Sequence, residues 1–398
     1  MNLQNNTIFR FDMFVLSICY VLLLFFVLSP AYETNDVPTV IRHANDGFIV
    51  TVSHHFLSYA IYFLNKGMQS NLWYGILTYI FTAICITINL SIFKYYLNKN
   101  VDFIIFLIVY FVYVSYFVLF IQYTNISIFS GVSSVLAFAH LYYNNNLTFL
   151  KSTVLGMLFS ASALFRVRGL EAVITIIFPL LLIITSSDVI DVWKNKITRR
   201  ALLVKWSFLL ILLIPSLLVY SYDFIYKGYL SPPQYRQWYE FDKLRSDIHG
   251  TPTARLNVDN QDMYDNTGWS PDDYENLRYW FFIDENIYNI KSLSKYHAVA
   301  KRPDYRAPIA SIVDVFKEYH QFMILFAALL LMNARQGKKS FILSSTILIY
   351  ALVVAALLHA YIRFPLRLGY PMFFSFSLIL FYLHFWLKAD NAENKNHR

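Results

Sequence analysis

The sequence predicts an all-α polytopic membrane protein with about ten transmembrane helices. Of its 398 residues, 57% are hydrophobic and only 15% are charged, whereas soluble domains carry about 25% charged residues. Uncharged apolar stretches of roughly 17–22 residues also recur along the chain, and a helix of that length crosses a bilayer. The expected spans, in order, are 13–30, 72–93, 103–122, 127–142, 152–166, 172–187, 204–222, 319–332, 341–360 and 370–387.

The first span, 13–30, is expected to be retained. It is too long and too uniformly apolar for a signal-peptide core, and no small-x-small cleavage site follows it. Both cysteines, Cys19 and Cys85, fall inside expected spans. The sequence therefore predicts no disulfide framework.

Lysine and arginine gather in alternate connections between the spans. The basic residues of this set are Lys94, Lys99, Lys151, Lys194, Lys196, Arg199, Arg200, Arg335, Lys338, Lys339 and Lys388. The positive-inside rule makes these connections cytoplasmic, with both termini on the same side. The net charge of +8 then reflects membrane anchoring, and no nucleic-acid partner is expected.

Three parts follow along the chain. Residues 1–222 form an N-terminal membrane module of about seven spans, and residues 319–398 form a C-terminal module of about three spans with a cytoplasmic tail. The segment 223–318 between them is too long for a connector, so it is expected to be a mainly helical extracytoplasmic domain. In the outer loop 31–71, the mixed polarity of 44–66 predicts an interfacial helix.

Two acids follow the first span at a spacing of three residues. Glu33 and Asp36 can therefore share one face of a helix or turn. Such a carboxylate could act as a general base on an acceptor hydroxyl, or hold a cation. The alternative, which spacing alone favours, is that the acids only mark where water begins. Arg42 and Asp46 in the same loop are weaker candidates on the same argument.

Four arginines on the expected outer side oppose the positive-inside bias. Arg166 and Arg168 lie between the fifth and sixth spans, and Arg363 and Arg367 lie between the ninth and tenth. Guanidinium groups bind phosphate bidentately, which suits a lipid-phosphate or pyrophosphate head group. General contact with lipid phosphates, or an ion pair of Arg168 with Glu171, is the equally weighted alternative.

Aromatic and acidic residues alternate densely in 265–288. Aromatic rings stack on sugars and carboxylates accept sugar hydroxyls, so this stretch would suit an acceptor glycan. The candidate acceptor-binding residues are Trp269, Arg278, Trp280 and Asp284. The alternative is the core of a small domain, with a helix capped by Ser270, then Pro271, then Asp272 and Asp273 in the first turn.

The sequence contains no motif for several other kinds of functional site. The sequence has no Walker loop, GxGxxG, CxxC pair or HExxH. His54 and His55 are adjacent, so they are expected on different faces of a helix, as interfacial residues and a poor metal pair. No string of charges lies inside a span and no inverted repeat is evident, which disfavours a transporter.

The order of these features resembles a broad group of bacterial membrane proteins found among surface-polysaccharide genes. The shared features are the outer "ND", the interfacial helix, R-x-R-x-x-E, "GWSPDDYENLRYWFFID" and R-x-P-x-R-x-x-x-P. The layout is similar to the GT-C glycosyltransferases, which use polyprenyl-phosphate-linked sugars. In that family an acid of the first outer loop is the catalytic base, and the matching position is Asp36. Asn35 stands where a second adjacent acid is common, with Glu33 nearby, so metal use is left open, a divalent cation being one option.

The resemblance implies a glycosyltransferase on the outer face of a bacterial inner membrane, in O-antigen, lipopolysaccharide or capsule biosynthesis. Its partners would be the bilayer and a polyprenyl-phosphate-linked or pyrophosphate-linked glycan. Asp36 would deprotonate the acceptor, and the four arginines would bind the donor phosphate. A repeat-unit polymerase is the first alternative, and a flippase for lipid-linked sugars is the second.

Overall fold

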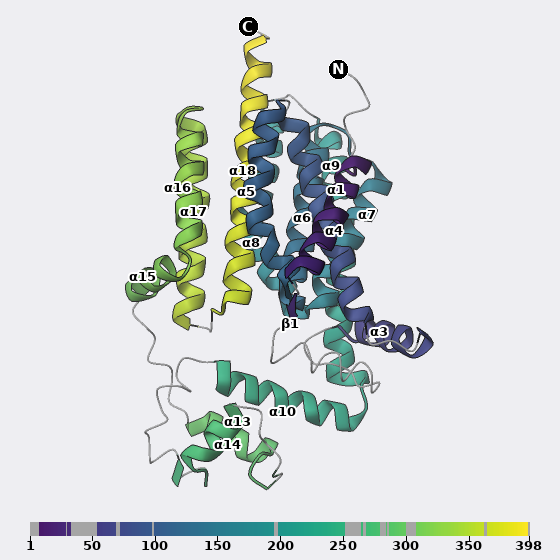
Figure 1. The fold of residues 1–398 in the computed structure, drawn as a ribbon, viewed down its shortest axis with the longest axis vertical. Coiled ribbons are helices and arrows are strands. Elements are labelled where there is room, and N and C mark those ends of the chain that lie inside the picture. The colour runs from purple at the N-terminus through teal and green to yellow at the C-terminus, as the bar shows by residue number, and fades with distance from the viewer. Residues whose placement is uncertain are drawn as a thin grey trace. The chain divides into compact units, whose positions relative to one another are not determined.

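In the computed structural model, the described residues are almost entirely helical (Figure 1). These residues are 8–28, 30–32, 54–68, 72–97, 99–194, 198–250, 264–265, 268–278, 284, 286–299, 308–361 and 364–396. Eight of their helices are long and apolar enough to cross a membrane, which confirms the all-α polytopic architecture. They are α1 (Phe11–Leu28), α4 (Trp73–Tyr96), α5 (Asn100–Leu119), α6 (Tyr123–Tyr143), α8 (Val167–Trp193), α9 (Arg199–Ile225), α17 (Lys338–Tyr361) and α18 (Leu366–Asn396).

Two of the ten expected spans are shorter helices. The 17 residues of α7 (Phe149–Phe165) fall short of the roughly 20 that cross a bilayer. The Thr148 hydroxyl caps the start of α7 by accepting a hydrogen bond from the amide of Lys151, and extended backbone at Arg166 ends it. The other is α16 (His320–Ala334), which follows α15 (Pro308–Glu318) at a 90° bend, so the pair counts as one broken span at most.

The chain divides into two compact units. The first comprises Met1–Asp223, Ile324–Leu348 and Tyr370–Arg398, and the second comprises Phe224–Met323 and Ile349–Gly369.

At the centre of the first unit lies α6, which packs against α4, α7 and α8. Of its apolar window, 94% is buried. Buried amide and hydroxyl groups join it to its neighbours: Asn89 on α4 donates to the Ser133 hydroxyl on α6 at 3.1 Å and to the Tyr110 hydroxyl on α5 at 3.3 Å. Small residues allow close approach, because a Cβ on Gly131 of α6 would lie 2.6 Å from a methyl of Val173 on α8. Such small-residue contacts and interhelical hydrogen bonds hold helices together in a bilayer.

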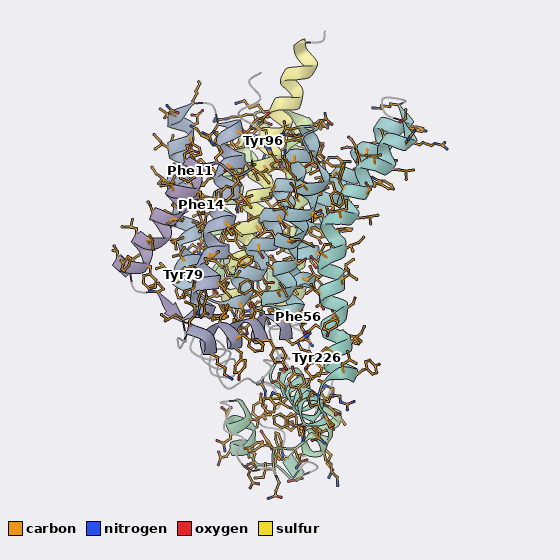
Figure 2. The ribbon with its side chains drawn as sticks, turned by 90° about the vertical axis from the view of Figure 1, so that its right-hand side faces the viewer. Phe11, Phe14, Phe56, Tyr79, Tyr96 and Tyr226 are labelled. Atoms are coloured by element: carbon orange, nitrogen blue, oxygen red, sulfur yellow. The ribbon has the colours of Figure 1, made fainter. Side chains whose placement is uncertain are left out.

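The helix α1 lies at the edge of the first unit. It packs on α4 and α5, and most of its surface stays open, as at Phe11, whose side chain is 76% exposed (Figure 2). An apolar cavity of about 820 Å³ lies between α1, α4 and α7, with Ile18, Ile84 and Met157 among its lining residues.

A short pairing that the sequence does not announce ties α1 to the rest of the unit. After α1, the two residues of β1 (Ala31–Tyr32) pair in parallel with β2 (Phe120–Ile121), which directly follows α5. Tyr32 is the partner of Ile121 in this register. The chain leaving the first span is thereby fixed beside the start of α6.

The second unit holds the π-helical turn η2 (Tyr226–Leu230), α10 (Pro233–Gly250), α13 (Pro271–Arg278), α14 (Ile290–Val299) and α15. Its core is built from aromatic and aliphatic side chains on α10, α13, α14 and the segments between them. These residues are Phe241, Ile248, Tyr264, Trp269, Tyr274, Leu277, Tyr288, Leu293 and Tyr296. The helical character expected of this part of the chain is confirmed for its described residues.

The predicted cap of α13 is confirmed. The Ser270 hydroxyl accepts a hydrogen bond from the Asp273 amide at 3.2 Å, and the Asp273 carboxylate accepts one from the Ser270 amide at 2.7 Å. Pro271 is the first helical residue, where its missing N–H costs nothing. This reciprocal pair is a capping box with Asp in place of Glu.

Candidate functional site

The proposed catalytic acids, Glu33 and Asp36, lie outside the described residues, and so do Arg363 and Trp280. The structure does describe where the segment carrying the acids begins and where it ends. It begins at Tyr32, which pairs with Ile121. It ends at His54, whose amide donates to the carbonyl of Leu164 at 3.0 Å.

Arg166 lies close to both of these anchor points. It directly follows α7, two residues after Leu164, and is half-buried. Its guanidinium donates a hydrogen bond to the Thr124 hydroxyl and lies 5.4 Å from the centre of the Tyr123 ring. Thr124 and Tyr123 open α6, immediately beyond β2. One end of the first unit therefore gathers a cation and both ends of the acid-bearing segment.

The two other candidate arginines that the structure describes, Arg168 and Arg367, have different surroundings. Arg168 is exposed in the first turn of α8, and Arg367 is half-buried in the first turn of α18, in the second unit. Glu171, the alternative partner considered for Arg168, accepts a hydrogen bond from the Tyr220 hydroxyl on α9 at 2.6 Å. Shared binding of one phosphate by the four arginines stays a prediction.

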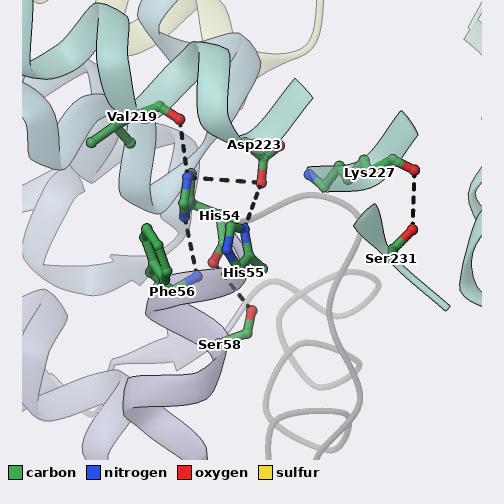
Figure 3. Close-up of polar contacts among 8 residues, drawn as sticks. All are labelled: His54, His55, Phe56, Ser58, Val219, Asp223, Lys227 and Ser231. Carbon is green, nitrogen blue, oxygen red and sulfur yellow. Dashed lines mark hydrogen bonds and ion pairs between the residues drawn. The ribbon is translucent and has the colours of Figure 1, made fainter. Parts of the chain in front are cut away.

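Among the described residues, two imidazoles and a carboxylate form a buried group that could hold a metal ion. His54 directly precedes α3 (His55–Met68), and Asp223 lies near the end of α9. The Nδ1 of His55 is 3.4 Å from Oδ1 of Asp223, and Nε2 of His54 is 4.0 Å from the same oxygen (Figure 3). The exposed fractions of the three residues are 0% for His54, 2% for His55 and 1% for Asp223.

This arrangement corrects the expectation that His54 and His55 point apart and make a poor metal pair. That expectation assumed that both residues lie within a helix, but α3 begins at His55. Because His54 stands before the helix, its ring stacks on that of His55, with centroids 4.5 Å apart and planes at 27°. Both rings thus reach the same carboxylate.

The hydrogen bonds of His54 define its protonation. Its Nδ1 accepts the amide N–H of Phe56 at 3.1 Å, which places the imidazole as a cap on the first turn of α3. Its Nε2 lies 3.0 Å from the carbonyl oxygen of Val219. A carbonyl only accepts, so Nε2 carries the proton and the ring is the neutral Nε2–H tautomer.

Sequence reasoning missed Asp223. It lies at the end of the apolar helix α9, and 168 residues separate it from His55. A single acid at the end of an apolar span indicates only that the chain enters water there. Only the adjacent histidines ahead of an amphipathic stretch could have marked this cluster.

The described acceptor-binding candidates lie in the small domain of the second unit, which is formed by α10, α13, α14 and the segments between them. Trp269 is 5% exposed, its indole N–H donates to the carbonyl of Ile287 at 3.3 Å, and its ring contacts Tyr288 and Tyr296. This is the core role that the sequence left as the alternative. Asp284 is exposed and accepts the amide of Asn286 at 2.9 Å, and Arg278 is the last residue of α13.

Comparison with known proteins adds no relative to these observations: no family model matches the chain, and no curated protein and no solved structure matches it.

Proposed function

We propose that this chain is a membrane-embedded glycosyltransferase that takes a sugar from a polyprenyl-phosphate donor at the end of the bundle that carries Arg166. The observation that carries the proposal is the anchoring of the segment 33–53 at both ends beside this arginine. Tyr32 pairs with Ile121, and the amide of His54 bonds to the carbonyl of Leu164. The proposal places the acids of this segment in the neighbourhood of that guanidinium.

Covalent geometry limits how far Asp36 can lie from that neighbourhood. It follows Tyr32 by four residues, so its Cα lies no more than about 14 Å from that of Tyr32. The acid would take the proton of an acceptor hydroxyl as its oxygen bonds to the sugar C1. The bond from C1 to the phosphate oxygen breaks in the same step, and Arg166 would stabilise the departing polyprenyl phosphate.

The apolar cavity between α1, α4 and α7 supports a donor with an isoprenoid chain. Its α7 lining reaches Leu158. Eight residues further along the chain is Arg166, a helical rise of roughly 12 Å. A chain in the cavity would present its phosphate toward the guanidinium. On this proposal the site faces the outside of a bacterial inner membrane, and both termini are cytoplasmic.

The test compares Asp36→Asn and Arg166→Gln in cells that lack the wild-type chain. Both changes remove a charge at nearly constant size, so surface polysaccharide should lose its added sugar while the protein still reaches the membrane. Matched controls are Asp102→Asn on α5 and Arg199→Gln on α9, both exposed first-turn residues far along the helices from Arg166. They should leave the product unchanged.

The readout is the composition and the length of the surface polysaccharide, with membrane levels of each variant measured by immunoblot. Normal product from both Asp36→Asn and Arg166→Gln would remove the proposal. Single repeat units on the lipid with Arg166→Gln, together with normal product from Asp36→Asn, would replace it with a polymerase.

A further inference from the structure

We infer that His54, His55 and Asp223 form a binding site for a divalent transition-metal cation. Each of the three offers one ligand atom, and these atoms all lie within 4.8 Å of one another. They come from two segments far apart in sequence, the start of α3 and the end of α9. The inference concerns binding alone and does not depend on the proposed glycosyl transfer.

The distances approach those of a loaded site. Two ligand atoms on a tetrahedral zinc lie roughly 3.3 Å apart, because each sits about 2.0–2.1 Å from the ion. The Nδ1 of His55 and Oδ1 of Asp223 are already 3.4 Å apart, and Nε2 of His54 is 4.0 Å from that oxygen. The three ligand atoms lie within 4.8 Å of one another, so loading would require His54 to move inward and to turn from its stacked position on His55.

The three ligand residues are enclosed by protein, since Asp223 is 1% exposed. A cation bound here would therefore be held by these side chains rather than by bulk water. Three protein ligands also leave one position open for water or an oxygen of a bound anion, as in catalytic rather than structural zinc sites.

The donor atoms determine which cations fit. Two imidazole nitrogens and one carboxylate oxygen suit Zn²⁺ and its transition-metal neighbours. Mg²⁺ and Ca²⁺ prefer oxygen ligands throughout. The site should therefore bind Zn²⁺ much more tightly than Mg²⁺.

Loading would change one hydrogen bond that can be followed separately. A cation needs the lone pair of Nε2 on His54, which at present carries the proton and faces the Val219 carbonyl. The proton would move to Nδ1, which then could no longer accept the amide of Phe56. Once this hydrogen bond is lost, the Phe56 amide should exchange faster with solvent deuterium.

The test uses the purified full chain in detergent, stripped of metal and titrated separately with Zn²⁺ and Mg²⁺ by calorimetry. Wild type should bind one Zn²⁺ per chain. His55→Ala and Asp223→Asn should each weaken binding at least about tenfold, because even the loss of a group that only orients a metal ligand has an effect of that size. His297→Ala, which removes an exposed histidine on α14, is the matched control and should bind as wild type does. Hydrogen–deuterium exchange should show faster exchange at Phe56 with Zn²⁺ in wild type only.

A variant that keeps a ligand separates metal binding from loss of folding. Asp223→His replaces the carboxylate with a third imidazole, so it should retain Zn²⁺ binding, whereas an ion pair alone would be destroyed by it. No Zn²⁺ binding by wild type would overturn the inference. The same holds for equal affinity in wild type, His55→Ala and Asp223→Asn, or for Mg²⁺ binding as tight as that of Zn²⁺.

Discussion

Gly169, in the first turn of α8, should not tolerate a methyl group. A Cβ at this position would overlap the hydroxyl of Ser127 on α6 and lie 2.8 Å from its Cβ. The hydroxyl donates to the carbonyl of Ser162 on α7 at 2.6 Å, so it cannot turn away without breaking that bond. Overpacking of this kind costs about 1–3 kcal/mol. The better helix propensity of alanine returns less than about 1 kcal/mol, so Gly169→Ala should destabilise the first unit by roughly 1–2 kcal/mol.

A double-mutant cycle isolates the steric part of this effect. Ser127→Gly opens the space and should itself cost about 1–2 kcal/mol, through one hydrogen bond and a glycine within a helix. If the overlap is the cause, the double variant should lose less stability than the two single variants lose in sum, by about 1 kcal/mol or more. Stability is measured by unfolding the purified chain from mild detergent with increasing SDS.

The matched control is Gly67→Ala, in α3, where an added Cβ meets nothing within 4 Å. It should be neutral or slightly stabilising. The reasoning fails if Gly169→Ala is as stable as Gly67→Ala, or if the losses of Gly169→Ala and Ser127→Gly simply add. Because the Gly169 amide also donates to the carbonyl of Arg166 at 2.8 Å, a shifted α8 should disturb that arginine as well.

Two further predictions concern the small domain of the second unit. Ser270→Ala removes the side-chain half of the α13 cap and should cost about 1 kcal/mol, seen as faster amide exchange across α13 only; unchanged exchange there would contradict the cap. Burial raises the pKa of the Tyr296 hydroxyl above its ordinary value of about 10. The folded domain therefore favours the neutral hydroxyl, and this contribution to stability is complete below pH 10 and is lost as the pH rises further. Tyr296→Phe should make the domain more resistant than wild type to an alkaline-active protease above pH 10, and no less resistant at pH 8. Equal sensitivity of the two proteins above pH 10 would show that Tyr296 is not the group responsible.

The long spans could be predicted because their signal is local. An uncharged run such as that of α1 must be helical and buried in lipid or protein wherever its neighbours lie. The cap at Ser270 was equally accessible, since a capping box lies within four consecutive residues. Spans at the limit of length were harder to judge, because α7 is ended by backbone geometry at Arg166 rather than by its composition.

The candidate metal site could not be predicted, because its signal is not local. Its chemistry depends on bringing His55 to Asp223 across 168 residues of sequence, and no periodic pattern records such a contact. It also depends on a helix that starts at His55 rather than before His54, and helix ends are the part of a helix that a sequence specifies least. The pairing of β1 with β2 could not be predicted either, because strands of two residues are too short to show an alternation of apolar and polar residues.

The burial of α6 has a consequence for how the chain enters the membrane during synthesis. Its mean hydropathy of 1.4 is the lowest among the eight candidate spans, and its apolar window is the most enclosed. Serine, threonine and asparagine residues along it need protein partners rather than lipid, yet two of its main neighbours, α7 and α8, emerge from the ribosome later. A nascent chain released after α6 would carry a span that its surroundings cannot yet accommodate, so membrane quality control should degrade fragments ending there and spare those that extend through α8.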